Sequence, residues 1–327
     1  MTSSYAIAFL GNATPAMRAA VTRHATPEFS VRFFDKGDIA GYRAAMPEID
    51  IIVALNIEIG EELLTLAPKL RIIHRWGVGL DTIDLTAAKK MGVAVAITSG
   101  VNTGPVAEFA VGLMLAVSRR IADIDRRMRA GDWVGQSLRS VSYTLAGKRI
   151  GLVGFGRIAQ AVTRRLAGFE SDIVVASHRS IDAQLLNTFR VQQLPLEELL
   201  KTSDIISLHA PLTSATRNLI NRQSLAMMKP GAFLINTARG ELIDEDALYD
   251  ALQNGGIGGA GLDVWTEEPT NPNNKLLALD QVVATAHVAG SVTETIETMV
   301  ERIFSNLRGV LAGKSGFVGD IVVTPEP

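Results

Sequence analysis

Arg149-Ile-Gly-Leu-Val-Gly154-Phe-Gly156-Arg-Ile-Ala159-Gln160 is the stretch that decides the fold. An apolar run typical of a buried strand leads into Gly154, Gly156 and Ala159, spaced as in the G-x-G-x-x-A form of the dinucleotide-binding fingerprint. Gly154 permits a tight turn, Gly156 lets the backbone approach a pyrophosphate, and the small Ala159 lets a helix pack on the strand. The helix that follows would offer its free N–H groups to the phosphates.

Around this stretch, short apolar runs alternate with longer amphipathic runs, a pattern that predicts βαβ units. Strands are predicted at 149–154, 172–177, 205–209, 233–237, 259–264 and 282–286. Helices are predicted between them at 158–169, 196–201, 221–228 and 244–254. The series amounts to a complete doubly wound parallel sheet.

The first third of the chain repeats the alternation on a smaller scale. Strands are predicted at 5–10, 51–55, 70–74 and 93–98, and helices at 15–24 and 61–67. Residues 107–128 are predicted to form one long helix that bridges two lobes and ends at Gly131. The amphipathic helix predicted at 292–311 is expected to return to the first lobe.

These patterns predict an α/β protein with two Rossmann-like or flavodoxin-like lobes, each a doubly wound parallel sheet, and an active site in the cleft between them. We expect a discontinuous substrate domain at 1–102 plus 290–327, and an NAD(P)-binding Rossmann domain at 103–289.

Composition narrows the function classes. The 327 residues are 47% hydrophobic and 20% charged, which is typical of a globular chain with room for two lobes. Cysteine is absent, which excludes disulfides, thiolate metal sites and a cysteine nucleophile. The 32 basic and 34 acidic residues show no basic stripe, so we expect no nucleic-acid partner. No secretory signal or membrane-spanning run is apparent, and we expect a cytoplasmic protein without membrane contact.

The strand predicted at 172–177 should end at the ribose of a bound dinucleotide, where NAD enzymes usually present Asp or Glu. This chain has Ser177, His178, Arg179 and Ser180 there instead. No carboxylate would repel a 2′-phosphate, and the planar guanidinium of Arg179 could pair with one. The residues therefore favour NADP(H), with NAD(H) still possible; alternatively, Arg179 is an ordinary solvated loop residue.

Three segments follow predicted strands of the second series, at the sheet edge where doubly wound folds bind ligands. They are 234–240 (Leu-Ile-Asn-Thr-Ala-Arg-Gly), 261–269 (Gly-Leu-Asp-Val-Trp-Thr-Glu-Glu-Pro) and 284–290 (Ala-Thr-Ala-His-Val-Ala-Gly). Together with 75–84, 106–108 and 203–213, these segments closely resemble the D-isomer-specific 2-hydroxyacid dehydrogenase family. The resemblance covers nearly the whole chain and is closest in character to the glyoxylate and hydroxypyruvate reductases.

The resemblance implies reduction of a 2-keto acid and a role for each motif residue. Arg239 would bind the substrate carboxylate and polarise the carbonyl, since arginine stays charged and binds two oxygens. His287 would donate the proton in reduction and accept it in oxidation, and Glu268 would pair with it and orient it. Asp263 would orient the nicotinamide. Backbone N–H groups around Val78 and Gly79 would hold the substrate carboxylate, with Trp76 lining the pocket; no metal is expected.

The same resemblance extends the set of cofactor-binding residues along the second series. His209 would lie beside the cofactor and take no acid–base part, while His24 and His74 are assigned no role. The cofactor-binding residues expected are Gly154, Gly156, Arg157, Ile158, Ser177, His178, Arg179, His209, Pro211, Thr216, Thr237, Ala238, Asp263, His287 and Gly290.

The substrate is narrowed by comparing branches of the resembled family. Glu268 disfavours the formate dehydrogenase branch, which lacks that residue. The phosphoglycerate branch usually carries Arg in the loop at 54–56 and at the position of Gly104, and neither is present. Arg75 could still bind a phosphate, because the direction of its side chain is open at this point. Since the chain ends at Pro327, we expect no regulatory domain. A small 2-keto acid such as glyoxylate or hydroxypyruvate fits best.

Two alternatives stay open on the sequence alone. One is an NAD-dependent dehydrogenase of another 2-hydroxy acid, such as D-3-phosphoglycerate. The other is a cofactor-sensing binding protein like the corepressors that share this fold. We also expect a homodimer with the helix at 107–128 near its interface, since two-fold dimers are common and the family suggests one.

Overall fold

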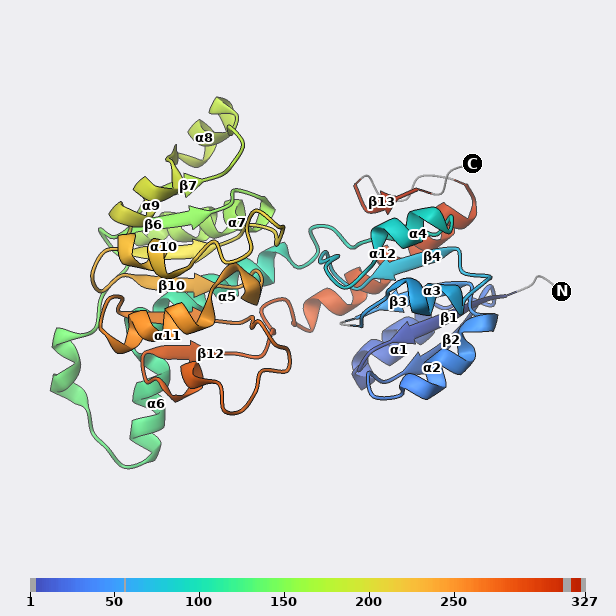
Figure 1. Cartoon of the computed structure of the whole chain (residues 1–327), viewed down its shortest axis with the longest axis horizontal. Helices are drawn as coiled ribbons and strands as arrows, with labels where there is room; N and C mark the ends of the chain where they lie inside the picture. Colours follow the sequence, from blue (N-terminus) through green and yellow to red (C-terminus); the bar gives the residue numbers. More distant parts are fainter. Residues whose placement is uncertain (1–3, 56, 314–318, 325–327) are drawn as a thin grey trace. The chain divides into compact units, whose positions relative to one another are not determined.

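The computed structural model describes residues 4–55, 57–313 and 319–324. Asn56, part of the loop in which phosphoglycerate enzymes carry Arg, lies outside the described residues. The chain divides into two compact units: unit 1 comprises Met1–Asn102 with Val292–Pro327, and unit 2 comprises Thr103–Ser291 (Figure 1).

Unit 1 contains a largely parallel sheet whose strand order is β13-β5-β4-β3-β1-β2. The strands are β1 (Tyr5–Leu10), β2 (Phe29–Phe34), β3 (Ile51–Ala54), β4 (Ile72–Arg75), β5 (Ala94–Ala96) and β13 (Ile321–Val323). Only β13 runs antiparallel, against β5. The parallel part has the 2-1-3-4-5 order of flavodoxin-like sheets. β1, β3 and β5 are nearly continuous apolar runs, as expected of parallel strands covered on both faces. β4 is buried throughout as well, although it ends in His74 and Arg75.

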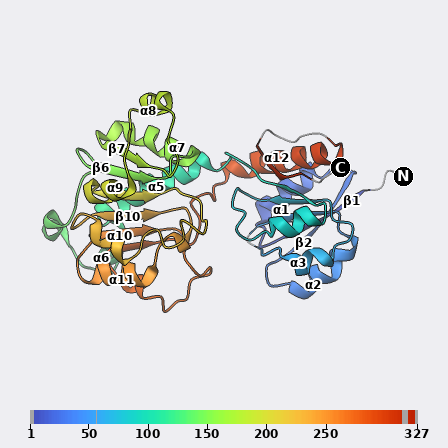
Figure 2. The same ribbon diagram turned by 45° about the horizontal axis from the view of Figure 1, so that its top comes forward.

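Helices cover both faces of this sheet. They are α1 (Pro15–His24), α2 (Ile39–Ala45), α3 (Glu61–Thr65), α4 (Leu85–Lys90), α12 (Glu294–Leu311) and the 3₁₀ turn η1 (Met46–Glu48). α1 begins where the Thr14 side chain accepts the Met17 N–H, with Pro15 in the first turn. α12 packs against α1 and β4 and buries Val300, Phe304 and Leu307 (Figure 2). The last long helix is thus part of the core of unit 1.

Unit 2 contains an all-parallel sheet in the order β12-β11-β10-β9-β6-β7-β8. The strands are β6 (Arg149–Val153), β7 (Asp172–Ala176), β8 (Gln192–Gln193), β9 (Ile205–Leu208), β10 (Phe233–Asn236), β11 (Gly259–Leu262) and β12 (Val282–Ala284). The chain reverses its direction of strand addition at β6 and β9, which is the Rossmann arrangement. The predicted α/β class with doubly wound parallel sheets is confirmed.

The helices of unit 2 flank that sheet. They are α5 (Thr103–Ser118), α6 (Ile121–Arg129), α7 (Arg157–Leu166), α8 (Ala183–Phe189), α9 (Leu196–Thr202), α10 (Arg222–Met227) and α11 (Glu245–Gln253), with 3₁₀ turns η2 (Gly135–Ser140), η3 (Ala167–Phe169), η4 (Gly240–Leu242) and η5 (Lys275–Ala278). α5 packs on α7, β10 and β11, and its contact with Gly259 and Gly261 is close enough that side chains there would meet Leu113 and Val117.

The prediction of one long helix over 107–128 is wrong. The chain breaks between α5 and α6, where Arg120 adopts a left-handed φ of 57°. α5 begins at Thr103 and ends at Ser118, and both helices belong to unit 2. The physical reason lies in the sequence beyond Ser118: α6 has no buried residue, so nothing on the sheet holds it in line with α5.

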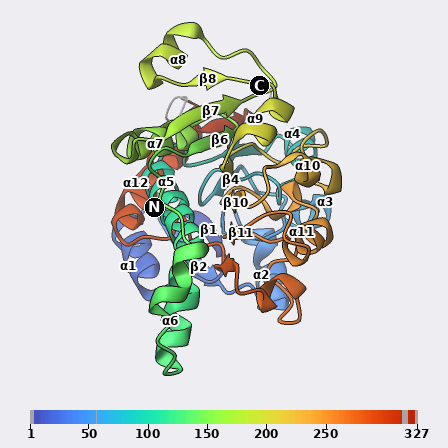
Figure 3. The same cartoon turned by 90° about the vertical axis from the view of Figure 1, so that its left-hand side faces the viewer.

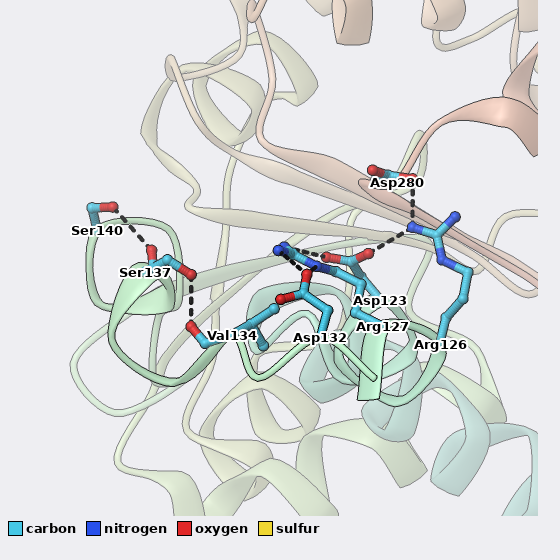
Figure 4. Close-up of polar contacts among 8 residues, drawn as sticks. All are labelled: Asp123, Arg126, Arg127, Asp132, Val134, Ser137, Ser140 and Asp280. Carbon is cyan, nitrogen blue, oxygen red and sulfur yellow. Dashed lines mark hydrogen bonds and ion pairs between the residues drawn. The ribbon is translucent and has the colours of Figure 1, made fainter. Parts of the chain in front are cut away.

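α6 extends away from the sheet of unit 2, as the green segment in Figure 3 shows. Its charged side chains form ion pairs: Arg126 donates to Asp123 on the same helix and to Asp280, just before β12, at 2.6 Å each, and Arg127 donates to Asp132 at 2.6 Å (Figure 4). Since these pairs are mostly exposed, each contributes only weakly to stability. None of the helices in the described part of the chain combines the length and apolar character that crossing a membrane requires.

Candidate active site

The β6–α7 turn has the geometry that the glycine spacing predicts. Gly154 has a φ of +94°, and a Cβ built there would lie 2.7 Å from the carbonyl oxygen of His209. Gly156 begins α7, and no atom lies within 4 Å of the Cβ it lacks. Ala159 is fully buried under the sheet. Backbone conformation and close approach therefore exclude a side chain at Gly154, and helix packing excludes a large one at Ala159. The open space at Gly156 leaves its backbone accessible from outside.

The start of α7 offers unsatisfied backbone donors. No side chain caps this helix, so the first-turn N–H groups, including those of exposed Arg157 and half-buried Ile158, have no intrahelical acceptor. A ten-residue helix also presents the positive end of its dipole here. This end of unit 2 thus fits the pyrophosphate of a dinucleotide.

The segment after β7 carries the residues expected at the adenosine ribose. Ser177 is half-buried, His178 and Arg179 are exposed, and the Ser177 Oγ accepts the Arg179 N–H at 3.4 Å. The Gln193 side chain, to which the sequence analysis gave no role, bonds to this segment from the neighbouring strand β8.

The segment after β9 carries His209, Pro211 and Thr216. The His209 Nε2 lies 3.0 Å from the Ser207 Oγ, and burial lowers the pKa of His209 to about 4, so the ring is neutral at physiological pH. The Thr216 hydroxyl donates to the Pro211 carbonyl at 2.7 Å and accepts the Thr213 N–H at 2.8 Å. Thr216 thereby fixes this turn, and His209 is suited to lie against a ligand without exchanging protons.

The segment after β10 is organised by Asn236, which is fully buried. Its amide nitrogen donates to the Arg239 carbonyl at 2.7 Å and its amide oxygen accepts the Ala238 N–H at 3.0 Å. The Arg239 Nη1 donates to the Ala238 carbonyl at 2.6 Å. The Thr237 hydroxyl, although buried, has no hydrogen-bond partner in the part of the chain that the structure describes. An unsatisfied buried hydroxyl at this edge of the sheet is what a polar ligand would satisfy.

Gly240 joins this segment to the one after β11. A Cβ at Gly240 would lie 1.9 Å from the carbonyl carbon of Trp265, so the two backbones are in direct contact. Since that neighbour is backbone, no side-chain movement could relieve a substitution. Gly240 therefore sets the spacing between the segments that carry Arg239 and Glu268.

Glu268 and His287 form a hydrogen-bonded pair. The Glu268 Oε2 lies 2.7 Å from the His287 Nδ1, and the Glu268 Oε1 accepts the Trp265 N–H at 3.1 Å. Burial alone would raise the pKa of Glu268, but the hydrogen bond from His287 and the charges of His287 and Arg239 outweigh it and hold that pKa below its usual value. The carboxylate is thus charged at neutral pH and fixes the orientation of the imidazole.

Asp263 holds the backbone around His287. The Asp263 carboxylate is fully buried and accepts the Thr285 hydroxyl at 2.7 Å and the N–H groups of Val288 and Ala289 at 2.9 and 2.8 Å. The Asp263 carbonyl accepts the His287 N–H at 2.6 Å, and His287 has a left-handed φ of 54°. Such a conformation is unusual for a residue with a side chain and persists only where its surroundings enforce it. The sequence predicted only a cofactor role for Asp263, because this second role depends on contacts with residues more than 20 positions away.

The structure thus brings Arg239, Glu268, His287 and Asp263 together at the carboxyl ends of β10, β11 and β12 in unit 2. Gly290, beyond the segment held by Asp263, is half-buried. Asn236 and Gly240 complete the arrangement; both stand in the motif quoted from the sequence, but their contacts depend on residues far along the chain.

The remaining predicted site residues belong to unit 1, in the loop after β4. Trp76 is half-buried in a T-shaped contact with the ring of Phe9, and Val78 is 38% exposed. Gly77 has a φ of +117° and its N–H and carbonyl are both bonded to Thr98. The bonds to Thr98 thus hold Gly77 in a backbone conformation that only glycine readily adopts.

The side chain of Arg75 fixes that loop to strand β3. Its guanidinium is buried and donates to the carbonyl of Gly79 at 3.0 Å and to that of Ala54 at 3.2 Å. This settles where its side chain points: Arg75 braces the loop.

A group that could hold a metal ion lies elsewhere in unit 1. Ligand atoms of His24, Glu297 and Glu301 lie within 4.8 Å of one another. The Arg23 guanidinium, however, donates to the Glu297 Oε2 at 2.6 Å, and its positive charge opposes a cation there. We assign no metal to this group.

Comparison with known proteins relates unit 2 to a described family. Residues 111–289 match the family described as "D-isomer specific 2-hydroxyacid dehydrogenase, NAD binding domain". The chain belongs to the D-isomer-specific 2-hydroxyacid dehydrogenase family. As a 2-hydroxyacid dehydrogenase it is an oxidoreductase, and unit 2 contains the NAD-binding domain of the family.

Several known enzymes are similar to this 2-hydroxyacid dehydrogenase over most of its length. A glyoxylate reductase of Thermococcus litoralis is 42% identical over 288 residues, which cover 86% of each chain. A hydroxypyruvate reductase of Thermotoga maritima is 41% identical over 270 residues, 80% of this chain and 86% of the relative. The structure of a D-lactate dehydrogenase from Aquifex aeolicus, complexed with NAD and lactic acid, matches with a TM-score of 0.87 at 27% identity, covering 98% of this chain and all of the other.

Proposed function

We propose that this dehydrogenase reduces a small 2-keto acid of the glyoxylate or hydroxypyruvate type to the D-2-hydroxy acid, with NADPH as the hydride donor. The observation that carries the proposal is the pair formed by the His287 Nδ1 and the Glu268 Oε2 at 2.7 Å, beside Arg239. Reduction of a keto acid requires a proton donor and a cationic group that binds the substrate carboxylate. The pair provides the first and Arg239 the second. The names of the similar reductases support the substrate class.

Each of the three side chains has a distinct task in this proposal. Arg239 binds the carboxylate of the substrate through its two-pronged donor geometry and polarises the adjacent carbonyl. The His287 Nε2 delivers a proton to the carbonyl oxygen and recovers it when the reaction runs backward. Glu268 keeps the His287 Nδ1 protonated, which leaves Nε2 to carry the exchangeable proton. The bound dinucleotide supplies the hydride.

The described residues fit such a dinucleotide, as the open approach to Gly156 and the unsatisfied Thr237 hydroxyl indicate. The turn at 154–158 would hold the pyrophosphate, Ser177, His178 and Arg179 the adenosine ribose, and His209, Pro211 and Thr216 the middle of the molecule. Thr237, Ala238, Asp263, His287 and Gly290 would lie along the nicotinamide half. Because the Asp263 carboxylate already accepts three hydrogen bonds, we propose that it serves the nicotinamide only with its remaining lone pairs.

The preference for NADPH rests on the segment after β7. The chain offers the exposed Arg179 and the hydroxyls of Ser177 and Ser180 where NAD enzymes usually have a carboxylate. A 2′-phosphate there would meet donors and one positive charge, with no acidic side chain from 177 to 181 to repel it.

The loop after β4 is proposed to bind the substrate. Backbone N–H groups around Val78 and Gly79 would bind the carboxylate, and Trp76 would line the pocket. Because Arg75 is engaged with the carbonyls of Gly79 and Ala54, it supports this loop and is not the phosphate receptor that a phosphoglycerate enzyme would need. Substrates with a small uncharged tail are therefore favoured.

We also propose that the protein forms a homodimer and works in the cytoplasm. The region from α6 onward exposes apolar side chains, among them Ile121 at 52% and Trp133 at 82%, that a second copy would cover. A monomeric mass in light scattering would refute the dimer.

The first experiment follows the absorbance of the reduced nicotinamide with glyoxylate and with hydroxypyruvate, comparing NADPH and NADH. Rapid oxidation of NADPH supports the proposal in full. A clear preference for NADH would support the proposed reaction but refute the proposal that Arg179 binds a 2′-phosphate. No oxidation of either cofactor, with NADPH binding retained, points to a larger substrate or to a cofactor-sensing protein.

A further inference from the structure

The segment 177–181 connects β7 to α8 with little support of its own. Within the part of the chain that the structure describes, its residues make no backbone-to-backbone hydrogen bond. Its internal support is the 3.4 Å bond from the Arg179 N–H to the Ser177 Oγ. Asp182 caps the start of α8 by accepting two N–H groups, so order resumes immediately after the segment.

One side chain from a different strand supplies the missing bonds. The Gln193 Nε2 donates to the Arg179 carbonyl at 2.9 Å and to the Ser177 carbonyl at 3.3 Å. The Gln193 Oε1 accepts the Ile181 N–H at 2.9 Å. The amide therefore bonds to the backbone at both ends and in the middle of the segment, using both its donor and its acceptor capacity.

Gln193 is itself well anchored. It lies on β8, which pairs in parallel with β7 so that Gln193 is opposite Val175, and the next residue, Leu194, donates to the Val175 carbonyl at 2.8 Å. Gln193 is half-buried, whereas its neighbour Gln192 is exposed. Because side chains alternate along a strand, Gln192 points to the opposite face. The two glutamines are thus a matched pair, one bonded to the segment and one not.

We propose that Gln193 is a positioning residue for cofactor specificity: it holds the backbone of 177–181 so that Ser177 and Arg179 present their donors to a 2′-phosphate. This inference rests on the proposed use of NADPH. Arginine binds a phosphate best through a planar fork whose direction is fixed, so a backbone that wanders at Arg179 loses part of that geometry. Ordering the segment at the moment of binding would also cost conformational entropy that Gln193 removes in advance.

The variants that test this are Gln193→Met and the matched control Gln192→Met. Methionine keeps the length of the side chain and abolishes the three hydrogen bonds. Binding to the full-length protein is measured by calorimetry with two probes, adenosine 2′,5′-bisphosphate and AMP, which differ only in the 2′-phosphate. Gln193→Met is expected to weaken the bisphosphate roughly tenfold, the equivalent of one or two lost hydrogen bonds, and AMP by less than about threefold. Gln192→Met should bind both probes as the wild type does.

A second readout tests the premise without any ligand. Hydrogen exchange of the Ile181 amide should accelerate in Gln193→Met, since its acceptor is gone, and stay unchanged in Gln192→Met. Unchanged exchange in both variants overturns the proposal, and so does equal weakening of the two probes, which would make Gln193 a general support of the fold.

Binding of the two probes to the wild-type protein distinguishes a failure of the proposed NADPH preference from a failure of the proposed role of Gln193. A wild type that binds both probes equally refutes the proposed NADPH preference and the role of Gln193 with it. A wild type that prefers the bisphosphate, with the preference intact in Gln193→Met, overturns the role of Gln193 alone.

Discussion

His74 in unit 1 and His287 in unit 2 both belong to chains of hydrogen bonds that reach a carboxylate, yet they differ in almost every other respect. His74 is fully buried, with its Nδ1 3.0 Å from the Arg75 carbonyl and its Nε2 3.1 Å from the Asn306 Nδ2. Asn306 in turn donates to the buried Asp320 at 3.0 Å. Both ring nitrogens are therefore used, and burial lowers the pKa of His74 to about 4.

His287 keeps part of its ring available. Its side chain is 35% exposed, and Nδ1 bonds directly to the Glu268 carboxylate. Its Nε2 has no hydrogen-bond partner in the described parts of the chain. The difference teaches that a histidine whose nitrogens are both satisfied in the interior ties strands together, whereas one with a fixed side and an open side can exchange protons.

The largest expected effect comes from removing the open histidine. His287→Ala should lower kcat roughly 10²- to 10⁴-fold, the usual contribution of a general acid–base group. Cofactor binding should survive, because the other cofactor-binding residues are unchanged. Steady-state kinetics with glyoxylate and a cofactor titration measure the two parts. Activity equal to that of the wild type would contradict the proposed mechanism.

Removing only the charge on its partner should have a smaller effect. Glu268→Gln replaces a charge-assisted hydrogen bond with a neutral one, and kcat/KM should fall roughly ten- to a hundredfold. Because the pKa of Glu268 lies below its usual value, the wild-type carboxylate stays charged from pH 5 to pH 9, and the deficit should persist over that range. The adjacent, exposed Glu267 provides the control, since Glu267→Gln should leave the rates unchanged; equal rates in both variants would remove Glu268 from the mechanism.

The buried histidine should affect stability and its pH dependence. Its pKa is lower in the folded protein, about 4 against an ordinary 6.5, so on acidification the unfolded chain takes up the proton first. The stability it contributes is present above pH 6.5 and is lost as the pH falls toward 4, by about 3 kcal/mol at most.

His74→Gln should therefore flatten the fall in unfolding free energy between pH 6.5 and pH 4, measured by urea denaturation. The slope should decrease without vanishing, because His209 has a similarly lowered pKa. A slope identical to that of the wild type would show that His74 is not neutral in the folded protein.

The smallest effect is expected for a third histidine, at the surface. The His24 Nε2 lies 2.7 Å from the Glu297 Oε1, but both side chains are partly exposed. His24→Ala should leave kcat unchanged and cost less than about 1 kcal/mol of stability, as exposed pairs usually do. A loss well above that value would mean that the stacking of His24 on Phe304 matters more than its ion pair.

Much of the fold could be read from local pattern. Strand runs such as 149–154 and 233–237, and helix 15–24, follow from apolar periodicity and from the capping at Thr14 and Pro15. The edge strands β2, β8 and β13 and the short helices α2, α4 and α8 were not predicted, because an edge strand buries less and a helix of six or seven residues shows little periodicity. The break at Arg120 was missed because both sides of it are helical in sequence; only the loss of packing beyond Ser118 ends the first helix.

By itself, the sequence determined where the backbone must turn at glycines, and it placed Arg239, Glu268 and His287 each just after a strand. It could do so because turn chemistry and strand ends are local properties. The tertiary structure alone decided which side chains meet: Gly240 against Trp265, Asp263 beneath the backbone of His287, and Gln193 along 177–181. Those contacts join residues up to 26 positions apart, or on neighbouring strands, and they depend on sheet register and packing, which no local pattern encodes.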